Sequence, residues 1–176
     1  QRENPKAKIV ITGCLTELDA PKIKTAVKDC LIVKNKDKFS LPAYFSSSAK
    51  KLKRPTAVKP KNTISYFQGH TRAFLKLQDG CDRFCAYCKV PLVRGRSRSR
   101  PLKEVINEAK ALVAAGYREI VLTGICLGDY GRGLRPQAHL VDAIEALEQI
   151  NGLWRIRLSS LEVTDIDKRL IAKLKS

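Results

Sequence analysis

The chain has 176 residues, of which 44% are hydrophobic, so it can bury a core as one ordinary domain or two small ones. No apolar run approaches the ~20 residues of a membrane span, and the first residues lack a signal-peptide pattern, so we expect a cytoplasmic protein with no membrane partner. The net charge is +17, and residues 38–103 hold 16 basic groups against Asp79 and Asp82. Such a focused positive charge favours nucleic acid as partner, with a merely solvated surface as the alternative.

The first 45 residues predict the end of an α/β domain. Residues 8–12 read as a short buried strand that ends at Gly13, residues 16–29 as a helix with Pro21 near its start, and residues 31–33 as a second strand. Residues 46–63 are rich in serine, proline and basic residues, and we interpret them as a basic linker between two domains. The complete absence of Met suggests a fragment or a processed chain.

Residues 64–176 repeat a strand–loop–helix pattern three times. The predicted strands cover residues 72–77, 119–123 and 154–158, and the predicted helices cover residues 102–113, 140–150 and 165–175. Such repeats form a parallel sheet with right-handed crossovers. Active groups of these folds collect at the carboxyl ends of the strands, and three candidate sites fall there: the cysteine loop, Thr123-Gly124 and Ser159-Ser160.

Three of the six cysteines lie within eight residues, as Cys81-x-x-x-Cys85-x-x-Cys88. A structural zinc site needs four ligands, and a bacterial ferredoxin run begins with a two-residue gap rather than three. Three thiolates can hold three irons of a cubane cluster and leave the fourth iron open for a small molecule, as a catalytic centre requires. The alternative is a partial zinc knuckle or a set of unrelated core cysteines.

The string CDRFCAYC resembles the cysteine motif of radical S-adenosylmethionine (SAM) enzymes, with Tyr87 just before the last cysteine. The segments 76–101, 116–131 and 155–162 are similar in order and spacing to the methylthiotransferase family. Within it, RGRSRSR and LTGICLGDYG look most like the branch that modifies threonylcarbamoyl-adenosine beside the tRNA anticodon. The resemblance covers roughly residues 8–38 and 64–163.

The resemblance implies an α/β chain: the end of an N-terminal methylthiotransferase domain in residues 1–45, then the first part of a radical SAM partial (β/α) barrel, truncated, in residues 64–176. It implies a SAM-binding 4Fe-4S cluster on Cys81, Cys85 and Cys88, and a second 4Fe-4S cluster in the full-length protein with Cys14 as one ligand. Residues that would line the SAM site are Tyr87, Thr123, Gly124, Ser159, Ser160 and Glu162. The family usually has Pro where Val163 stands, which weakens the assignment of Glu162.

The other two cysteines receive no such role. Cys30 is interpreted as a core residue. Cys126 stands where the branch usually carries His, and it is interpreted as a neutral replacement or as a contact to substrate or cluster.

The implied reaction replaces a C–H of the adenine ring by C–S–CH3. The implied partners are tRNA, a flavodoxin- or ferredoxin-like electron donor and a sulfur donor. Four alternating arginines are expected to contact the RNA backbone from one face of an extended loop: Arg94, Arg96, Arg98 and Arg100. The alternatives are an isopentenyl-adenosine tRNA or a ribosomal protein as target, or an RNA-binding module whose cluster is structural.

Overall fold

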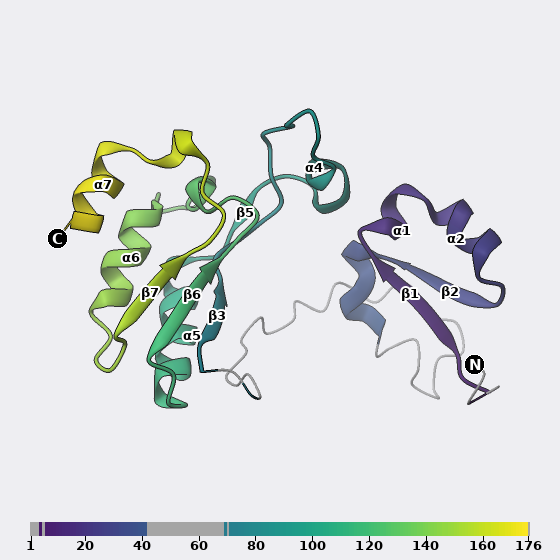
Figure 1. Ribbon diagram of the computed structural model, residues 1–176, viewed down its shortest axis with the longest axis horizontal. Coiled ribbons are helices and arrows are strands. Elements are labelled where there is room, and N and C mark those ends of the chain that lie inside the picture. The colour runs from purple at the N-terminus through teal and green to yellow at the C-terminus, as the bar shows by residue number, and fades with distance from the viewer. Residues whose placement is uncertain (1–3, 5, 42–68, 70, 176) are drawn as a thin grey trace. The chain divides into compact units, whose positions relative to one another are not determined.

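The computed structural model describes residue 4, residues 6–41, residue 69 and residues 71–175 (Figure 1). The described residues fall into two compact units. The first holds the described residues up to 41 together with Tyr87–Arg94, and the second holds those from 69 to 86 and from Gly95 onward. The predicted linker, residues 46–63, lies outside the described residues.

The first unit is built on two parallel strands, β1 (Ile9–Gly13) and β2 (Cys30–Lys34). Their register runs from Ile9 opposite Cys30 to Gly13 opposite Lys34, and both predicted strands are confirmed. The buried hydroxyl of Thr16 lies 2.8 Å from the Gly13 carbonyl oxygen and 3.2 Å from that of Val33, so it can donate to either strand end. The remaining elements are α1 (Leu15–Leu18), α2 (Ala20–Ala26), the 3₁₀ helix η1 (Asn35–Ser40) and α4 (Val90–Arg94).

The single helix predicted for residues 16–29 is wrong, because the chain forms two short helices instead. The break falls at Asp19, whose φ of −129° and ψ of 35° are not helical. Pro21 explains it: proline has no N–H to donate to the carbonyl of Glu17, and its ring would clash with that carbonyl in a continuous helix. A helix can restart with proline in its first turn, as α2 does.

The second unit contains a three-stranded parallel sheet in the order β3-β6-β7, as the repeated pattern predicts. The strands are β3 (Ala73–Lys76), β6 (Glu119–Thr123) and β7 (Arg155–Leu158). They alternate with α5 (Leu102–Ala114), α6 (Leu140–Glu148) and α7 (Lys168–Lys175). Two short strands that were not predicted, β4 (Gln78–Asp79) and β5 (Arg98–Ser99), pair antiparallel across the loop that carries the cysteines.

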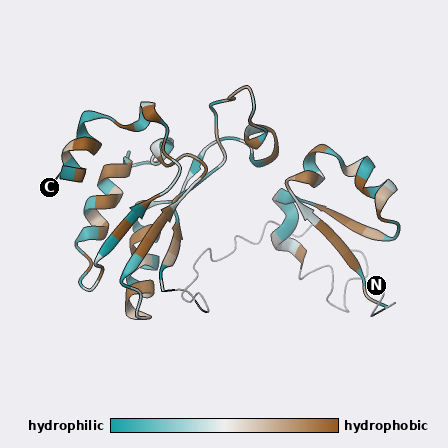
Figure 2. Cartoon of the chain, viewed as in Figure 1, coloured by the Kyte–Doolittle hydropathy of each residue, from teal (hydrophilic) through white to brown (hydrophobic). Residues whose placement is uncertain are grey.

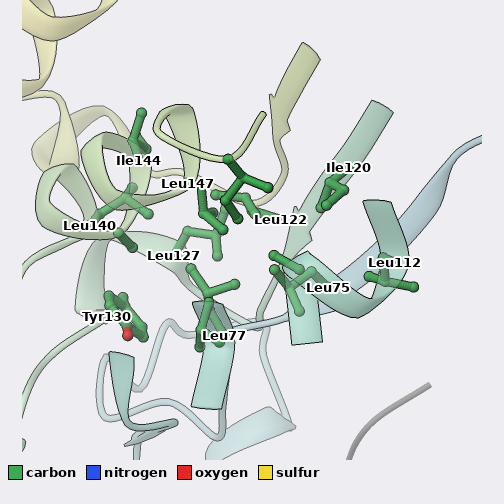
Figure 3. Packing of buried hydrophobic residues seen from close by; sticks show 14 of the residues in the cluster. Leu75, Leu77, Leu112, Ile120, Leu122, Leu127, Tyr130, Leu140, Ile144 and Leu147 are labelled. Carbon is green, nitrogen blue, oxygen red and sulfur yellow. The ribbon is translucent and has the colours of Figure 1, made fainter. Parts of the chain in front are cut away.

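The core lies between this sheet and its helices, because alternate strand residues point to the helical side. Figure 2 shows β6 as largely hydrophobic, whereas α6 alternates between hydrophobic and hydrophilic faces. The strand residues Leu75 and Leu122 are fully buried. They share one hydrophobic cluster with Leu127 and with side chains of the helices, and Figure 3 shows Leu122, Leu127 and Leu147 directed toward one another. The pattern is that of strands covered by amphipathic helices.

The opposite face of the sheet is more exposed and mixes charged side chains with the aromatic ring of Phe74. Phe74 and Lys76 of β3 are exposed there, and so are Arg155 and Arg157 of β7. The Glu119 carboxylate lies 3.4 Å from the guanidinium of Arg155 and 3.3 Å from that of Arg157. None of the helices in the described part of the chain is long and apolar enough to cross a bilayer.

The last predicted helix begins later than expected. Residues Val163–Asp165 form the 3₁₀ helix η3, and α7 starts at Lys168. The Asp165 carboxylate accepts the Glu162 N–H at 2.9 Å, which caps η3. Asp167 in turn accepts the Leu170 N–H at 2.7 Å at the start of α7. Aspartate accepts such local backbone bonds readily, so the segment turns before the helix begins.

Candidate functional site

The carboxyl edge of the β3-β6-β7 sheet carries the loops that the sequence singles out. The register pairs Leu122 with Leu158, so Thr123 and Ser159 follow at the same edge of the sheet. The cysteine loop leaves the neighbouring strand β3 at this edge, where the Leu77 N–H donates to the Thr123 carbonyl oxygen at 2.8 Å. In the second unit, loops from three strands therefore converge as expected for an α/β site.

The cysteine loop begins with a tight turn at Gly80. Its φ is +76°, and a Cβ there would overlap the backbone carbonyl oxygen of Arg96. The next residue, Cys81, is buried, and its N–H donates to the Gly95 carbonyl oxygen at 3.0 Å. Glycine at position 80 thus lets the two sides of the loop approach closely.

The remaining cysteines of the motif are more open to solvent. Cys85 is partly exposed in the second unit, and Cys88 is partly exposed in the segment Tyr87–Arg94, which groups with the first unit. All six cysteines are free thiols. Among the described residues, no three histidine, cysteine or acidic side chains are gathered as a ready-made metal site.

The donor set itself fits an iron–sulfur cluster. Thiolates are the ligands that such clusters take, and Cys81, Cys85 and Cys88 lie on one short loop without a disulfide. A cluster often orders the segment that binds it, because metal binding and folding are coupled. The loop therefore has the thiolate donors that a cluster needs.

Gln78 is the buried side chain that joins the cysteine loop to the loop after β6. Its Nε2 donates to the Gly80 carbonyl oxygen at 2.6 Å and to Ser97 Oγ at 2.8 Å. Its Oε1 accepts the N–H groups of Ile125 and Cys126, at 2.9 and 3.1 Å. One buried amide thus satisfies polar groups of both loops, as a buried polar residue must.

Arg83 is the second connection between these loops. Its guanidinium is paired with Asp165 and lies 3.4 Å from Asp129 Oδ1 and 3.1 Å from Thr164 Oγ1. The hydrogen bond to Asp165 is the main reason why the pKa of Arg83 is raised. Burial raises the pKa of Asp165, but its bonds to the Glu162 N–H and Arg83 outweigh burial, so that pKa lies below its ordinary value.

Cys126 lies beside this ion pair and is almost fully buried. Its Sγ is 3.4 Å from Asp165 Oδ2. Burial, and then the nearby carboxylate, raise the pKa of the Cys126 thiol to about 11. A thiol with this raised pKa stays protonated at neutral pH, which suits a hydrogen-bond donor to Asp165.

The four arginines expected on one face are not equivalent. Arg94 ends α4 in the first unit, whereas Arg96, Arg98 and Arg100 belong to the second. The side chain of Arg96 is 92% exposed, and Arg98 is exposed as well. Arg100 instead points into the protein, 2.6 Å from buried Glu108, and it also donates to the Lys76 carbonyl oxygen at 2.8 Å. We therefore take Arg100 out of the set that could contact phosphate.

The residues expected to line a SAM site differ in exposure. Tyr87, Ser160 and Glu162 are exposed, whereas Thr123, Gly124 and Ser159 are partly buried. The Thr123 hydroxyl donates to the Leu75 carbonyl oxygen at 3.3 Å. In the first unit, partly exposed Cys14 follows β1 directly, and Cys30 donates to the Val27 carbonyl oxygen at 3.3 Å.

Sequence reasoning missed the residues that hold the loops together: Gln78, Arg83, Asp129 and Asp165. The signal for Arg83 was its place between two cysteines of the motif. No comparable local signal marks its partner Asp165, which lies 82 residues away. A pairing over that distance follows from the fold and not from spacing.

Comparison with known proteins agrees with this architecture. The model of the radical SAM superfamily matches residues 75–176. A threonylcarbamoyladenosine tRNA methylthiotransferase of Chlamydia pneumoniae is 43% identical over 96% of this chain and 38% of its own length. Its counterpart in Bacillus subtilis is 33% identical over 98% of this chain and 40% of its own length.

A related enzyme with another named product is also similar. The tRNA-2-methylthio-N(6)-dimethylallyladenosine synthase of Clostridium novyi is 31% identical over 97% of this chain and 40% of its own length. The chain thus spans about two fifths of the length of these relatives. By its sheet, its cysteine motif and these matches, the chain belongs to the radical SAM superfamily and is a relative of its tRNA methylthiotransferases.

Proposed function

We propose that the full-length protein is a radical SAM transferase that methylthiolates threonylcarbamoyl-adenosine next to the tRNA anticodon. The observation that carries this proposal is the three-cysteine loop at the carboxyl edge of a parallel sheet, in a chain similar over most of its length to enzymes of that name. Sheets of this kind bind ligands at that edge, which supports the placement of the chemistry.

In this proposal Cys81, Cys85 and Cys88 hold a 4Fe-4S cluster, which with SAM would supply a carbon radical that removes hydrogen from the substrate. Cys14 is one ligand of a second cluster in the full-length protein. The chain's own task is to orient the loops that carry these groups and to exclude water from them. Gln78 supports that task, because its buried amide fixes the start of the cysteine loop against the loop after β6.

The SAM site would be completed at the ends of β6 and β7 and beside the last cysteine. Thr123, Gly124, Ser159, Ser160, Glu162 and Tyr87 are the proposed contacts. A Cβ at Gly124 would lie 3.1 Å from Gln78 Oε1, so the strand end has little room for a side chain there. Exposed hydroxyl and carboxylate groups such as those of Ser160 and Glu162 can bind the hydroxyls of a ribose.

The tRNA backbone is the proposed partner of Arg94, Arg96 and Arg98. Guanidinium groups bind phosphates in pairs of parallel hydrogen bonds, and such contacts contribute affinity rather than base selection. The electron donor would be a flavodoxin- or ferredoxin-like protein, and a separate donor would supply sulfur. We propose a cytoplasmic location, where a tRNA substrate is available.

Dimethylallyl-adenosine is a second candidate substrate, because the similar protein of Clostridium novyi is named for it. The two candidate substrates are distinguished by an experiment in cells that lack the gene for this protein. Nucleosides from total tRNA are analysed by mass spectrometry before and after the full-length gene is restored. We expect 2-methylthio-threonylcarbamoyladenosine to return. Return of the dimethylallyl product alone would reassign the substrate, and return of neither would contradict the proposed activity.

A further inference from the structure

Three segments far apart in the sequence meet at the guanidinium of Arg83. This residue stands between two proposed cluster ligands, Cys81 and Cys85. Its partners are Asp129 of η2 (Leu127–Asp129) and Asp165 of η3, both in the same unit as Arg83. The ion pair with Asp165 thus ties the cysteine loop to the chain that follows β7. We call Arg83, Asp129 and Asp165 the Arg83 clamp.

Asp165 is shared between two loops of the proposed site. Its side chain is only 5% exposed, and Oδ1 is paired with Arg83. The other oxygen, Oδ2, accepts the N–H of Glu162, a proposed SAM contact, at 2.9 Å. One buried carboxylate therefore holds the cysteine loop on one side and the Glu162 turn on the other.

Gly128, the residue before Asp129 in η2, is packed tightly against the side chain of Asp165. A Cβ at Gly128 would overlap the carboxylate of Asp165, so any larger residue would displace that side chain. The backbone of η2 thus comes close to Asp165 only because position 128 lacks a side chain. This steric requirement is independent of the charges in the clamp.

We propose that the Arg83 clamp positions the cysteine loop against the Glu162 turn, so that the cluster and SAM are presented to each other in a fixed geometry. The inference rests on the proposed function, because it assigns both loops to one SAM site. Arg83 acts through the loop and is a positioning residue. Mutation of residues that orient metal ligands without binding the metal themselves typically lowers metal affinity or activity by about 10–100-fold.

The test compares four variants of the full-length protein. Arg83→Met removes the charge and Gly128→Ala displaces Asp165 without altering any charge. Arg83→Lys restores one donor to Asp165, and Arg155→Met is the control, since the Arg155 side chain is 68% exposed and lies 3.4 Å from Glu119, outside the cysteine loop. The first readout is amide hydrogen exchange of residues 79–86 in the cluster-free protein. The second is SAM affinity of the reconstituted protein, read from the change that SAM makes in the cluster's EPR spectrum.

We expect faster exchange of residues 79–86 in Arg83→Met and Gly128→Ala, and SAM affinity lowered about 10–100-fold in both. Arg83→Lys should recover part of each loss, and Arg155→Met should match wild type in both measurements. Wild-type exchange and SAM affinity in both Arg83→Met and Gly128→Ala would overturn the clamp. If wild type takes up no cluster, the proposed function fails, and the exchange data alone decide whether Arg83 holds the loop.

Discussion

The buried ion pair between Arg100 and Glu108 leads to a prediction that separates a structural arginine from an RNA-binding one. The Arg100 side chain is 12% exposed and that of Glu108 is 3% exposed. Arg100 also donates its backbone N–H to the Leu77 carbonyl oxygen and its guanidinium to the Lys76 carbonyl oxygen, both at 2.8 Å. It therefore fastens the end of β3 to α5.

Arg100→Met would remove the guanidinium that is paired with the buried Glu108 carboxylate. Breaking a buried pair from one side typically costs about 3–5 kcal/mol, whereas replacing both members by apolar residues is often close to neutral. We therefore expect Arg100→Met to lower the free energy of unfolding by about 3 kcal/mol or more. The double variant Arg100→Met/Glu108→Leu should recover most of that loss.

The assay is urea denaturation of the full-length protein, followed by circular dichroism at neutral pH. Arg96→Met is the matched control, because its side chain is 92% exposed and substitutions at such sites usually change stability by less than about 0.5 kcal/mol. The affinity of both variants for tRNA is measured alongside their unfolding. If Arg100→Met has the same unfolding free energy as Arg96→Met and lowers the affinity for tRNA as much as Arg96→Met does, Arg100 is a phosphate contact and the structural assignment is refuted.

Two further predictions concern the loops at the carboxyl edge. Gly131→Ala should lower the thermal unfolding temperature measured by calorimetry, because φ at this position is +91° and a Cβ would overlap the Ala138 carbonyl oxygen. Gly133 also has a positive φ, but a Cβ there would meet open space. Gly133→Ala should therefore lower the unfolding temperature less than Gly131→Ala does. In the cluster-free protein, Cys126 should be the slowest of the cysteines to react with iodoacetamide at a pH of about 7.5, since burial and a pKa of about 11 keep it a thiol. Its alkylation, followed by mass spectrometry of folded protein, should accelerate as the pH rises toward that pKa, and early alkylation near neutral pH would contradict this assignment.

Much of the fold was predictable from periodicity. The parallel β3-β6-β7 sheet and its three helices follow from alternating apolar strands and helical apolar spacing, and these are local properties of the sequence. The failed helix of residues 16–29 shows where that approach stops. Its apolar spacing favoured one helix, but the backbone chemistry of Pro21 divided it into two.

The candidate site was predictable in part. The cysteine loop and the positions after β6 and β7 were identified because strand ends and motif spacing are visible in sequence. The roles of Arg83 and Arg100 were not, because they depend on partners brought close by folding, Asp165 and Glu108. An arginine in a basic run can be exposed, as Arg96 is, or buried, as Arg100 is, and charge patterning alone does not distinguish these cases.

In the proposed function, the cysteine loop holds a cluster that binds and cleaves SAM. The most direct test is anaerobic iron–sulfur reconstitution of the full-length protein, followed by dithionite, SAM and an assay for 5′-deoxyadenosine. We expect wild type to form 5′-deoxyadenosine and Cys85→Ala to form none, while Cys30→Ala, outside the proposed ligands, remains active. If the protein assembles its cluster but neither binds nor cleaves SAM, the proposed enzyme function is wrong, and an RNA-binding protein with a structural cluster is indicated.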